Sequence, residues 1–64
     1  MLEEMRKFYA DAMPHSNQEL YDYFKELIGE ENPDEQRHLL RGLQQTLKRD
    51  NELVNIGHAI WQAA

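Results

Sequence analysis

The four residues Asn32-Pro33-Asp34-Glu35 mark the start of a helix and constrain this chain more than any other feature. Asn is a preferred N-cap, Pro has the backbone geometry of the first helical position, and acidic side chains are stabilised at the positive end of a helix dipole. From Gln36 to Trp61 apolar residues recur at helical spacing, and no proline interrupts them. We therefore expect one long amphipathic helix over residues 33–63.

The ambiguous position in this tract is Asp50. Seven residues follow one another in alternating steps of three and four, as the inward positions of a coiled coil do: Leu40, Leu43, Leu47, Asp50, Val54, Gly57 and Trp61. Either Asp50 caps a new helix that begins there, or one helix continues with a polar residue in its apolar stripe. No Gly or Pro marks a break, so the pattern favours a continuous helix with a possible break near residue 50.

Two shorter helices are expected before this one. Apolar residues share one face of residues 2–13, and Pro14 disfavours helical geometry at the residue before it. Ser16 and Glu19 have the spacing of a capping box and open a second helix over residues 17–28, which Gly29 ends. A short turn over residues 30–32 then favours an antiparallel neighbour.

These lengths predict an all-α protein. Residues 2–28, kinked at Pro14, form one arm of a helical hairpin, and residues 33–63 form the other. The chain has 64 residues and no cysteine, so it must rely on good helix packing or on a partner chain rather than on disulfides. We expect a homodimer to complete a small helical bundle. The alternative is a compact monomer of three or four helices that bends at Asp50.

Hydropathy and the first residues of the chain predict a soluble, cytoplasmic protein. No segment approaches the roughly 20 apolar residues that a membrane span needs. The first residues, Met1-Leu2-Glu3-Glu4, carry acid where a signal peptide carries base. The lack of cysteine fits a reducing compartment. We expect no interaction with a membrane.

No motif in the sequence carries a specific chemistry. Glu35 and His38 have the Glu-x-x-His spacing of di-iron bundles, but such sites need two motifs, and Glu35 serves the helix start. His15 beside Ser16 could suggest a base and a nucleophile, but adjacent residues seldom point at each other and Ser16 has a capping role. We expect no catalytic residue, no cofactor and no metal, and hence no enzyme.

The distribution of charge suggests how the protein acts, more than the net charge of −5 does. Acidic residues concentrate between Glu19 and Glu31, and tyrosines flank the apolar stripe of this segment. Tyr and Trp are frequent at interface hot spots. We expect a small regulatory or adaptor protein that binds another protein through this acidic face, with contacts from Tyr21, Asp22, Tyr23, Glu26 and Trp61.

The alternative function is that of a nucleic-acid-binding hairpin dimer. Arg37, Arg41 and Lys48 form a basic stripe along one helix, with Gln44 and Gln45 between them. Such a stripe can lie along a phosphate backbone. Nucleic-acid-binding modules are more often basic overall, so the net charge argues against a nucleic acid as the partner.

Overall fold

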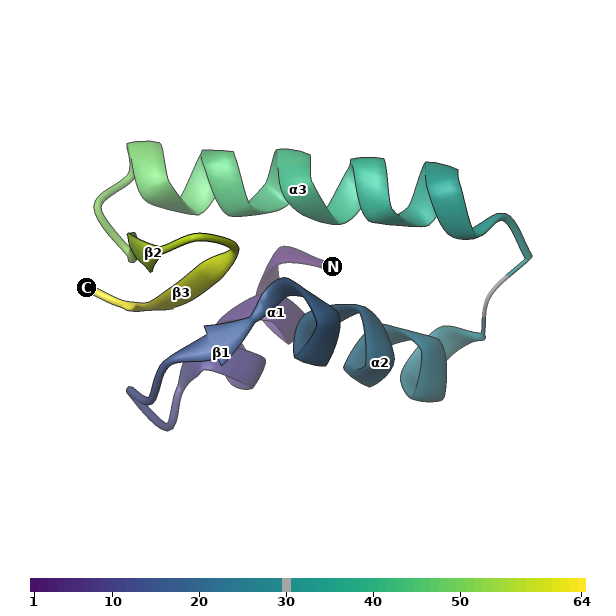
Figure 1. Ribbon diagram of the computed structural model, residues 1–64, viewed down its shortest axis with the longest axis horizontal. Helices are drawn as coiled ribbons and strands as arrows, with labels where there is room; N and C mark the ends of the chain where they lie inside the picture. The colour runs from purple at the N-terminus through teal and green to yellow at the C-terminus, as the bar shows by residue number, and fades with distance from the viewer. Residues whose placement is uncertain (30) are drawn as a thin grey trace.

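The computed structural model describes residues 1–29 and 31–64, as three helices and a three-stranded antiparallel sheet (Figure 1). The elements follow in the order α1 (Leu2–Tyr9), β1 (His15–Ser16), α2 (Asn17–Ile28), α3 (Pro33–Arg49), β2 (Leu53–Gly57) and β3 (Ile60–Ala63). The strand order is β1-β3-β2, so the last strand lies in the middle of the sheet. The fold is mixed α/β, and the prediction of an all-α helical bundle was wrong.

Both helix starts that the sequence predicts are confirmed. The Asn32 side chain accepts a hydrogen bond from the backbone N–H of Glu35 at 3.2 Å, and Pro33 is the first residue of α3. The Ser16 hydroxyl accepts a hydrogen bond from the backbone N–H of Glu19 at 3.1 Å. These caps satisfy N–H groups that have no partner inside the helix.

The second helix has the predicted bounds. It ends at Gly29, whose φ of 80° lies in the region that a residue with a side chain rarely adopts. The turn expected over residues 30–32 includes residue 30, which lies outside the described residues. Beyond this turn α3 runs beside α2 in the opposite direction (Figure 1).

The first helix is shorter than the predicted range of residues 2–13. It ends at Tyr9, and Ala12 in the following turn has a φ of 59°. The Asp11 carboxylate accepts a hydrogen bond from the backbone N–H of Met13 at 3.0 Å, which is a local alternative to helical bonding. The chain is therefore extended where it enters β1.

The helix expected over residues 33–63 ends at Arg49. Asp50 is its C-cap, and Asn51 has a φ of 63°. Asn tolerates this left-handed conformation better than most residues other than Gly. The helix therefore breaks at residue 50, as one of the two alternatives allowed, but no second helix begins at Asp50, and the favoured continuous helix was wrong.

Backbone hydrogen bonds show why α3 stops there. The N–H of Asn51 donates to the carbonyl of Lys48 at 3.0 Å, and the N–H of Glu52 donates to the carbonyl of Leu47 at 2.8 Å. This pair of bonds is the Schellman motif, which satisfies the last carbonyls of a helix and turns the chain away. Asn51 is thus the stop signal at a position that neither Gly nor Pro marks.

Residues 53–63 form a β-hairpin instead of the last turns of a helix. β2 pairs antiparallel with β3, with Leu53 opposite Ala63 and Asn55 opposite Trp61. β1 adds a short third strand, in which His15 lies opposite Trp61. The tract that the sequence assigned to helix is therefore an extended ribbon that closes one end of the molecule (Figure 1).

The two faces of the hairpin differ, because successive side chains of a strand point to opposite sides. Leu53 is buried, whereas Val54, Ile56 and Ile60 are exposed. A helical seam through Val54 and Gly57 was therefore a wrong interpretation of the spacing. β-Branched residues such as these three are frequent in strands.

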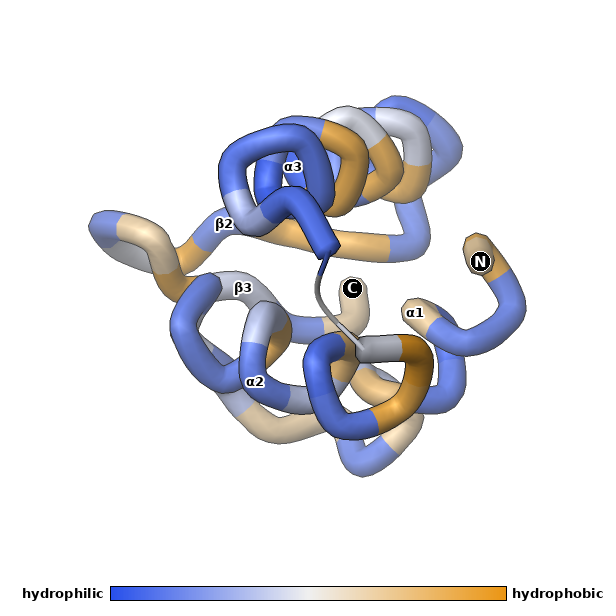
Figure 2. Tube along the Cα trace, turned by 90° about the vertical axis from the view of Figure 1, so that its right-hand side faces the viewer, coloured by the Kyte–Doolittle hydropathy of each residue, from blue (hydrophilic) through white to orange (hydrophobic). Residues whose placement is uncertain are grey.

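The chain closes a hydrophobic core by itself. α3 lies on one side of this core and α1 and α2 on the other, with the hairpin at one end (Figure 2). Among the described residues, the core holds eight buried apolar side chains: Met5, Tyr9, Leu20, Phe24, Leu40, Leu47, Leu53 and Trp61. Homodimerisation stays a prediction.

Candidate anion-binding site between α3 and the hairpin

The basic side chains of α3 have no acidic partner within residues 1–29 and 31–64. The two cations of α1 are paired: Arg6 contacts the Glu52 carboxylate at 2.9 Å, and Lys7 contacts that of Glu4 at 3.3 Å. No Asp or Glu follows Glu35 inside α3. Four cations of this helix form no ion pair with a described residue: Arg37, Arg41, Lys48 and Arg49.

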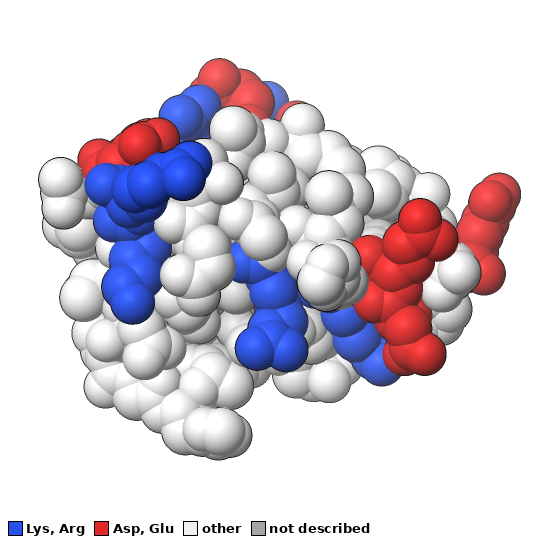
Figure 3. All heavy atoms as spheres, turned by 90° about the horizontal axis from the view of Figure 1, so that it is seen from above, with Lys and Arg blue, Asp and Glu red and all other residues white. Residues whose placement is uncertain are grey.

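Three of these cations share one side of the molecule. Arg37, Arg41 and Lys48 are four and seven residues apart, so they project from the same side of α3. Seen from above α3, Lys and Arg occur at intervals along this face, and the acidic side chains gather toward its ends (Figure 3). The face is therefore positively charged in a protein whose net charge is −5.

Aromatic rings hold two of the cations in place. The guanidinium carbon of Arg37 lies 5.5 Å from the centre of the Tyr21 ring on α2. The ammonium nitrogen of Lys48 lies 5.9 Å from the centre of the Trp61 ring on β3. Cation–π contacts of this kind orient the charge and leave its other sides open to an anion.

A hollow of about 410 Å³ opens between α3, the start of α2 and the hairpin. Arg41 and Lys48 line it from α3, and Asn55 and His58 line it from the hairpin. No carboxylate is present among the described residues that line it, although the chain has 12 acidic residues. The hollow therefore favours an anionic ligand.

Gln44 is a buried polar residue in the wall of this hollow, with 1% of its surface exposed. Its Nε2 donates to the hydroxyl of Tyr9 at 3.0 Å and to Oδ1 of Asn17 at 3.0 Å. Burial raises the pKa of Tyr9, and the bond from Gln44 opposes that rise. Because both amide hydrogens are used, the orientation of the Gln44 carboxamide is fixed.

The Oε1 atom of Gln44 accepts no hydrogen bond from any residue that the structure describes. Among the described residues, the buried side-chain atom without a hydrogen-bond partner is Nε2 of Gln36, so Oε1 of Gln44 is open enough for water to reach it. An acceptor held in one orientation in the wall of a hollow is therefore suited to a ligand or water that donates a hydrogen bond.

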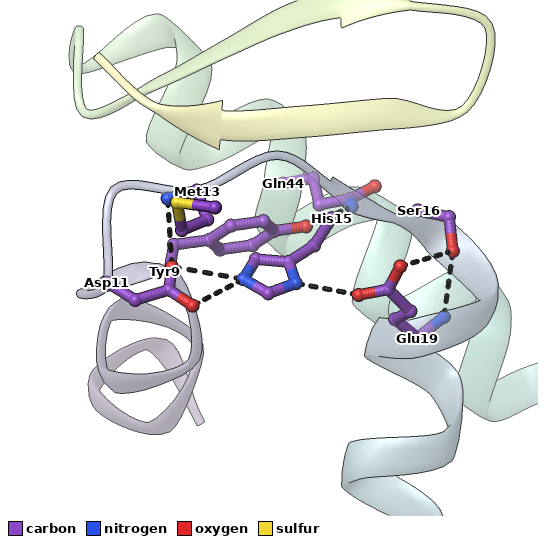
Figure 4. A network of polar contacts seen from close by, with 7 residues as sticks. All are labelled: Tyr9, Asp11, Met13, His15, Ser16, Glu19 and Gln44. Atoms are coloured by element: carbon purple, nitrogen blue, oxygen red, sulfur yellow. Dashed lines mark hydrogen bonds and ion pairs between the residues drawn. The ribbon is translucent and has the colours of Figure 1, made fainter.

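A second polar cluster fastens β1 to its neighbours (Figure 4). Nε2 of His15 lies 2.8 Å from Oδ2 of Asp11, and Nδ1 lies 2.7 Å from Oε2 of Glu19. The contact with Glu19, and then that with Asp11, raises the pKa of His15, because both carboxylates stabilise the protonated ring. The ring also packs against Phe8, with 4.7 Å between the ring centres.

The cluster gives His15 two acidic partners that the sequence analysis did not identify. Two acids lie four residues before and after it, at Asp11 and Glu19, and this spacing was the available signal. Ser16 does not face His15 as a nucleophile would. Its hydroxyl instead lies 3.5 Å from the Glu19 carboxylate and serves the start of α2. The arrangement stabilises a turn and provides no catalytic triad.

The five residues expected to bind a protein partner do not form one surface. Tyr21 faces α3 and borders the hollow, whereas the Tyr23 hydroxyl donates to Oε2 of Glu4 on α1 at 3.3 Å. Trp61 belongs to the core, with 6% of its surface exposed. A helix places residues 21 and 23 on different sides, which explains this separation.

The acidic members of that set lie on the exposed side of α2. Asp22 and Glu26 are both exposed, and Asp22 accepts a hydrogen bond from Nε2 of Gln18 at 3.0 Å. The structure thus brings these two carboxylates together, one helical turn apart, but separates them from Trp61. Of the predicted set, they alone remain available as neighbours on an open face.

The structure does bring together the three residues that the sequence predicted for nucleic-acid binding. Arg41 and Lys48 line the hollow, and Arg37 lies next to it over Tyr21. Sequence reasoning missed Asn17, Asn55 and His58, because the hairpin that places the last two opposite α3 was expected to be helix. No local pattern of residues indicates such a long-range pairing.

Comparison of this chain with protein-family models, with curated proteins and with solved structures finds no match. In the parts of the chain that the structure describes, no helix combines the length and the apolar character that crossing a bilayer requires. The α3 face and the hollow beside it are therefore the features that bear on function.

Proposed function

We propose that this protein binds nucleic acid, with the phosphate groups of the backbone lying along α3. The observation that carries the proposal is the set of four α3 cations without an acidic partner among the described residues, three of which project from one side of the helix. Contacts between Lys or Arg and phosphates supply most of the sequence-independent affinity of nucleic-acid-binding proteins. A cation that is unpaired in the free protein breaks no ion pair when it binds a phosphate.

The acidic net charge is compatible with this function, because the charge is segregated. No acidic residue is among the described residues that line the hollow beside Arg41 and Lys48, whereas Asp22 on α2 lines a second hollow together with Arg37. At physiological ionic strength the Debye length is about 8 Å, so exposed charges farther apart than this interact weakly. Local charge next to the ligand therefore matters more than the sum over the chain.

Polar groups beside the cations support the same proposal. Gln45 is exposed on α3, and Asn55 and His58 lie across the hollow from it. Phosphate contacts position a protein on a nucleic acid, and side chains that donate and accept hydrogen bonds contact sugars and base edges. The α3 face combines both kinds of group.

Fluorescence anisotropy with a labelled single-stranded oligonucleotide at low salt tests the proposal. We expect saturable binding that weakens at least tenfold in the double variant Arg41→Ala/Lys48→Ala. The matched control is Arg6→Ala/Lys7→Ala, which removes the same charge from α1, and it should weaken binding less than threefold. Circular dichroism of each variant checks that the fold is kept.

Two results would overturn this function. One is the absence of binding by the folded wild-type protein at low salt. The other is an equal loss of affinity in the α1 control, since that would mean that only net charge matters and that no α3 surface exists.

A protein partner on α2 is the second candidate. The exposed Asp22 and Glu26 are followed by Leu27 and Ile28, of which 48% and 57% is exposed. Acidic and aliphatic side chains together suit a partner with a basic, partly apolar surface. The variant Asp22→Lys/Glu26→Lys should then lose capture of a protein partner while its oligonucleotide affinity stays equal or rises. Unchanged capture in this folded variant would exclude the α2 face.

A further inference from the structure

We infer that the hollow between α3 and the hairpin seats one unpaired nucleotide, with its phosphate at Arg41 and Lys48 and its base among carboxamide side chains. The inference rests on the proposed nucleic-acid function and specifies which part of the ligand this site recognises. The volume of about 410 Å³ lies within the range of about 300 to 1,000 Å³ that is usual for small-molecule sites.

The phosphate end of the site is set by α3. Arg41 and Lys48 are exposed, line the hollow and have no acidic partner within residues 1–29 and 31–64. Arg37 and Arg49, on the same helix, are not among the described residues that line the hollow. Two α3 cations thus face the seated nucleotide, and the other two remain available for phosphates of the neighbouring nucleotides.

The base end of the site consists of carboxamides. Four of them line the hollow: Asn17, Gln44, Gln45 and Asn55. Nδ2 of Asn55 donates to the carbonyls of Gly57 at 2.9 Å and of Ile60 at 3.0 Å, so its two hydrogens are used, as are those of Gln44. The oxygens of Gln44 and Asn55 accept no hydrogen bond from a described residue.

Two oriented acceptors that water can otherwise reach favour a ligand that donates hydrogen bonds over one that only accepts them. A phosphate at neutral pH offers them almost nothing, whereas every nucleobase carries N–H groups on its pairing edge. In a duplex these N–H groups are already donated to the complementary base. An unpaired nucleotide can offer them to the protein, which is the usual way in which single strands are recognised.

Titration of the ¹⁵N-labelled full chain with 5′-mononucleotides, followed by NMR, tests this site directly. Ribose 5-phosphate is the comparison, because it carries the phosphate and lacks the base. We expect the side-chain amide signals of Gln44 and Asn55 and the indole signal of Trp61 to shift. The side-chain amides of Gln18 and Gln62, which are not among the residues lining the hollow, should shift little.

The expected affinities follow from the contacts. At least one mononucleotide should bind about tenfold more tightly than ribose 5-phosphate, because its base adds up to two hydrogen bonds to oriented acceptors. Arg41→Ala and Lys48→Ala should each weaken mononucleotide binding about fivefold. The matched controls Arg37→Ala and Arg49→Ala should change it less than twofold. The same spectra show whether each variant is folded.

Several results would overturn the site. Equal affinity for every mononucleotide and for ribose 5-phosphate would exclude recognition of the base. Equal effects of Arg37→Ala and Arg41→Ala would exclude the hollow as the phosphate position. Signal changes confined to residues outside the hollow would do the same.

The failure of this site can be distinguished from a failure of the proposed function. If oligonucleotides bind through α3 while mononucleotides show no preference over ribose 5-phosphate, the function stands and the nucleotide site falls. If no oligonucleotide binds but mononucleotides bind at the hollow, the nucleotide site stands and the function falls. A single strand that binds more tightly than a duplex of equal length supports both.

Discussion

The Nε2 atom of Gln44 donates a hydrogen bond to the hydroxyl of Tyr9 at 3.0 Å and joins α3 to α1 inside the core. Both side chains are almost completely buried, with 1% and 2% of their surfaces exposed. This bond fixes the carboxamide whose oxygen remains without a partner among the described residues beside the hollow. The same contact therefore joins two helices in the core and orients the Gln44 carboxamide of the candidate site.

Removing the Tyr9 hydroxyl should destabilise the protein. Tyr9→Phe leaves one buried N–H of Gln44 without a partner, which costs about 1–3 kcal/mol of unfolding free energy. Tyr23→Phe, the control, removes a hydroxyl that is only partly buried and should cost less. Urea unfolding of both variants measures the difference. Equal losses would contradict a special role for the buried bond.

The cluster of Asp11, His15 and Glu19 should make stability depend on pH. The raised pKa of His15 adds stability that is fully present below its ordinary value of 6.5 and is lost as the pH rises through the raised pKa. The pKa of Asp11 is lowered first by the hydrogen bond from the Met13 N–H and then by the hydrogen bond with His15. The pKa of Glu19 is lowered first by its hydrogen bond with His15. These carboxylates add stability that is lost as the pH falls through their lowered pKa values.

The cluster should therefore stabilise the fold most between about pH 4.5 and 6.5. Thermal unfolding of the wild type from acidic to alkaline pH should show the melting temperature falling as the pH rises above this window. His15→Gln should remove most of that fall, whereas His38→Gln, at an exposed position of α3, should keep it. Parallel curves for the wild type and His15→Gln would contradict the assignment.

The end of α3 should be sensitive to the residue at position 51. The φ of 63° at Asn51 suits Asn and Gly, so Asn51→Gly should keep or raise the stability. Asn51→Val should lower the unfolding free energy by about 1–2 kcal/mol, because a β-branched side chain is strained in this conformation. Gln45→Val, within the helix, controls for helix propensity. A harmless Asn51→Val would mean that the helix does not end here.

Adjacent residues of β2 should respond differently to truncation. Leu53 is buried with 4% of its surface exposed, so Leu53→Ala should cost about 2–5 kcal/mol of unfolding free energy. Val54 is 41% exposed, and Val54→Ala should cost less than about 1 kcal/mol. Chemical denaturation measures both. Similar losses at the two positions would contradict the alternation that the hairpin requires.

The parts of the fold that could be predicted depend on local chemistry. Ser16 and Asn32 cap the helices that follow them, and Gly29 ends α2, because each acts on backbone groups only a few residues away. The hairpin could not be predicted in this way. Its residues matched the spacing of a helical seam by coincidence, and its strands gain their stability from pairing with β1 and from burying Trp61.

The site was predictable to a similar extent. Arg37, Arg41 and Lys48 lie within one helix, so their common side followed from helical spacing alone. Asn55 and His58 reach the hollow through the β2–β3 ribbon, which depends on long-range pairing. Asn51, which ends α3, was the local signal that could have distinguished a hairpin from a continuous helix. Asn is less frequent than Gly at this position of a helix end.

The salt dependence of oligonucleotide binding tests the central claim most directly. The logarithm of the association constant should fall linearly with the logarithm of salt concentration. For a single strand that contacts all four α3 cations we expect a slope of about −3, and Arg41→Ala should reduce its magnitude by about 0.7. Lys7→Ala on α1 should leave the slope unchanged. No binding at low salt, or a slope near zero in the wild type, would contradict the account.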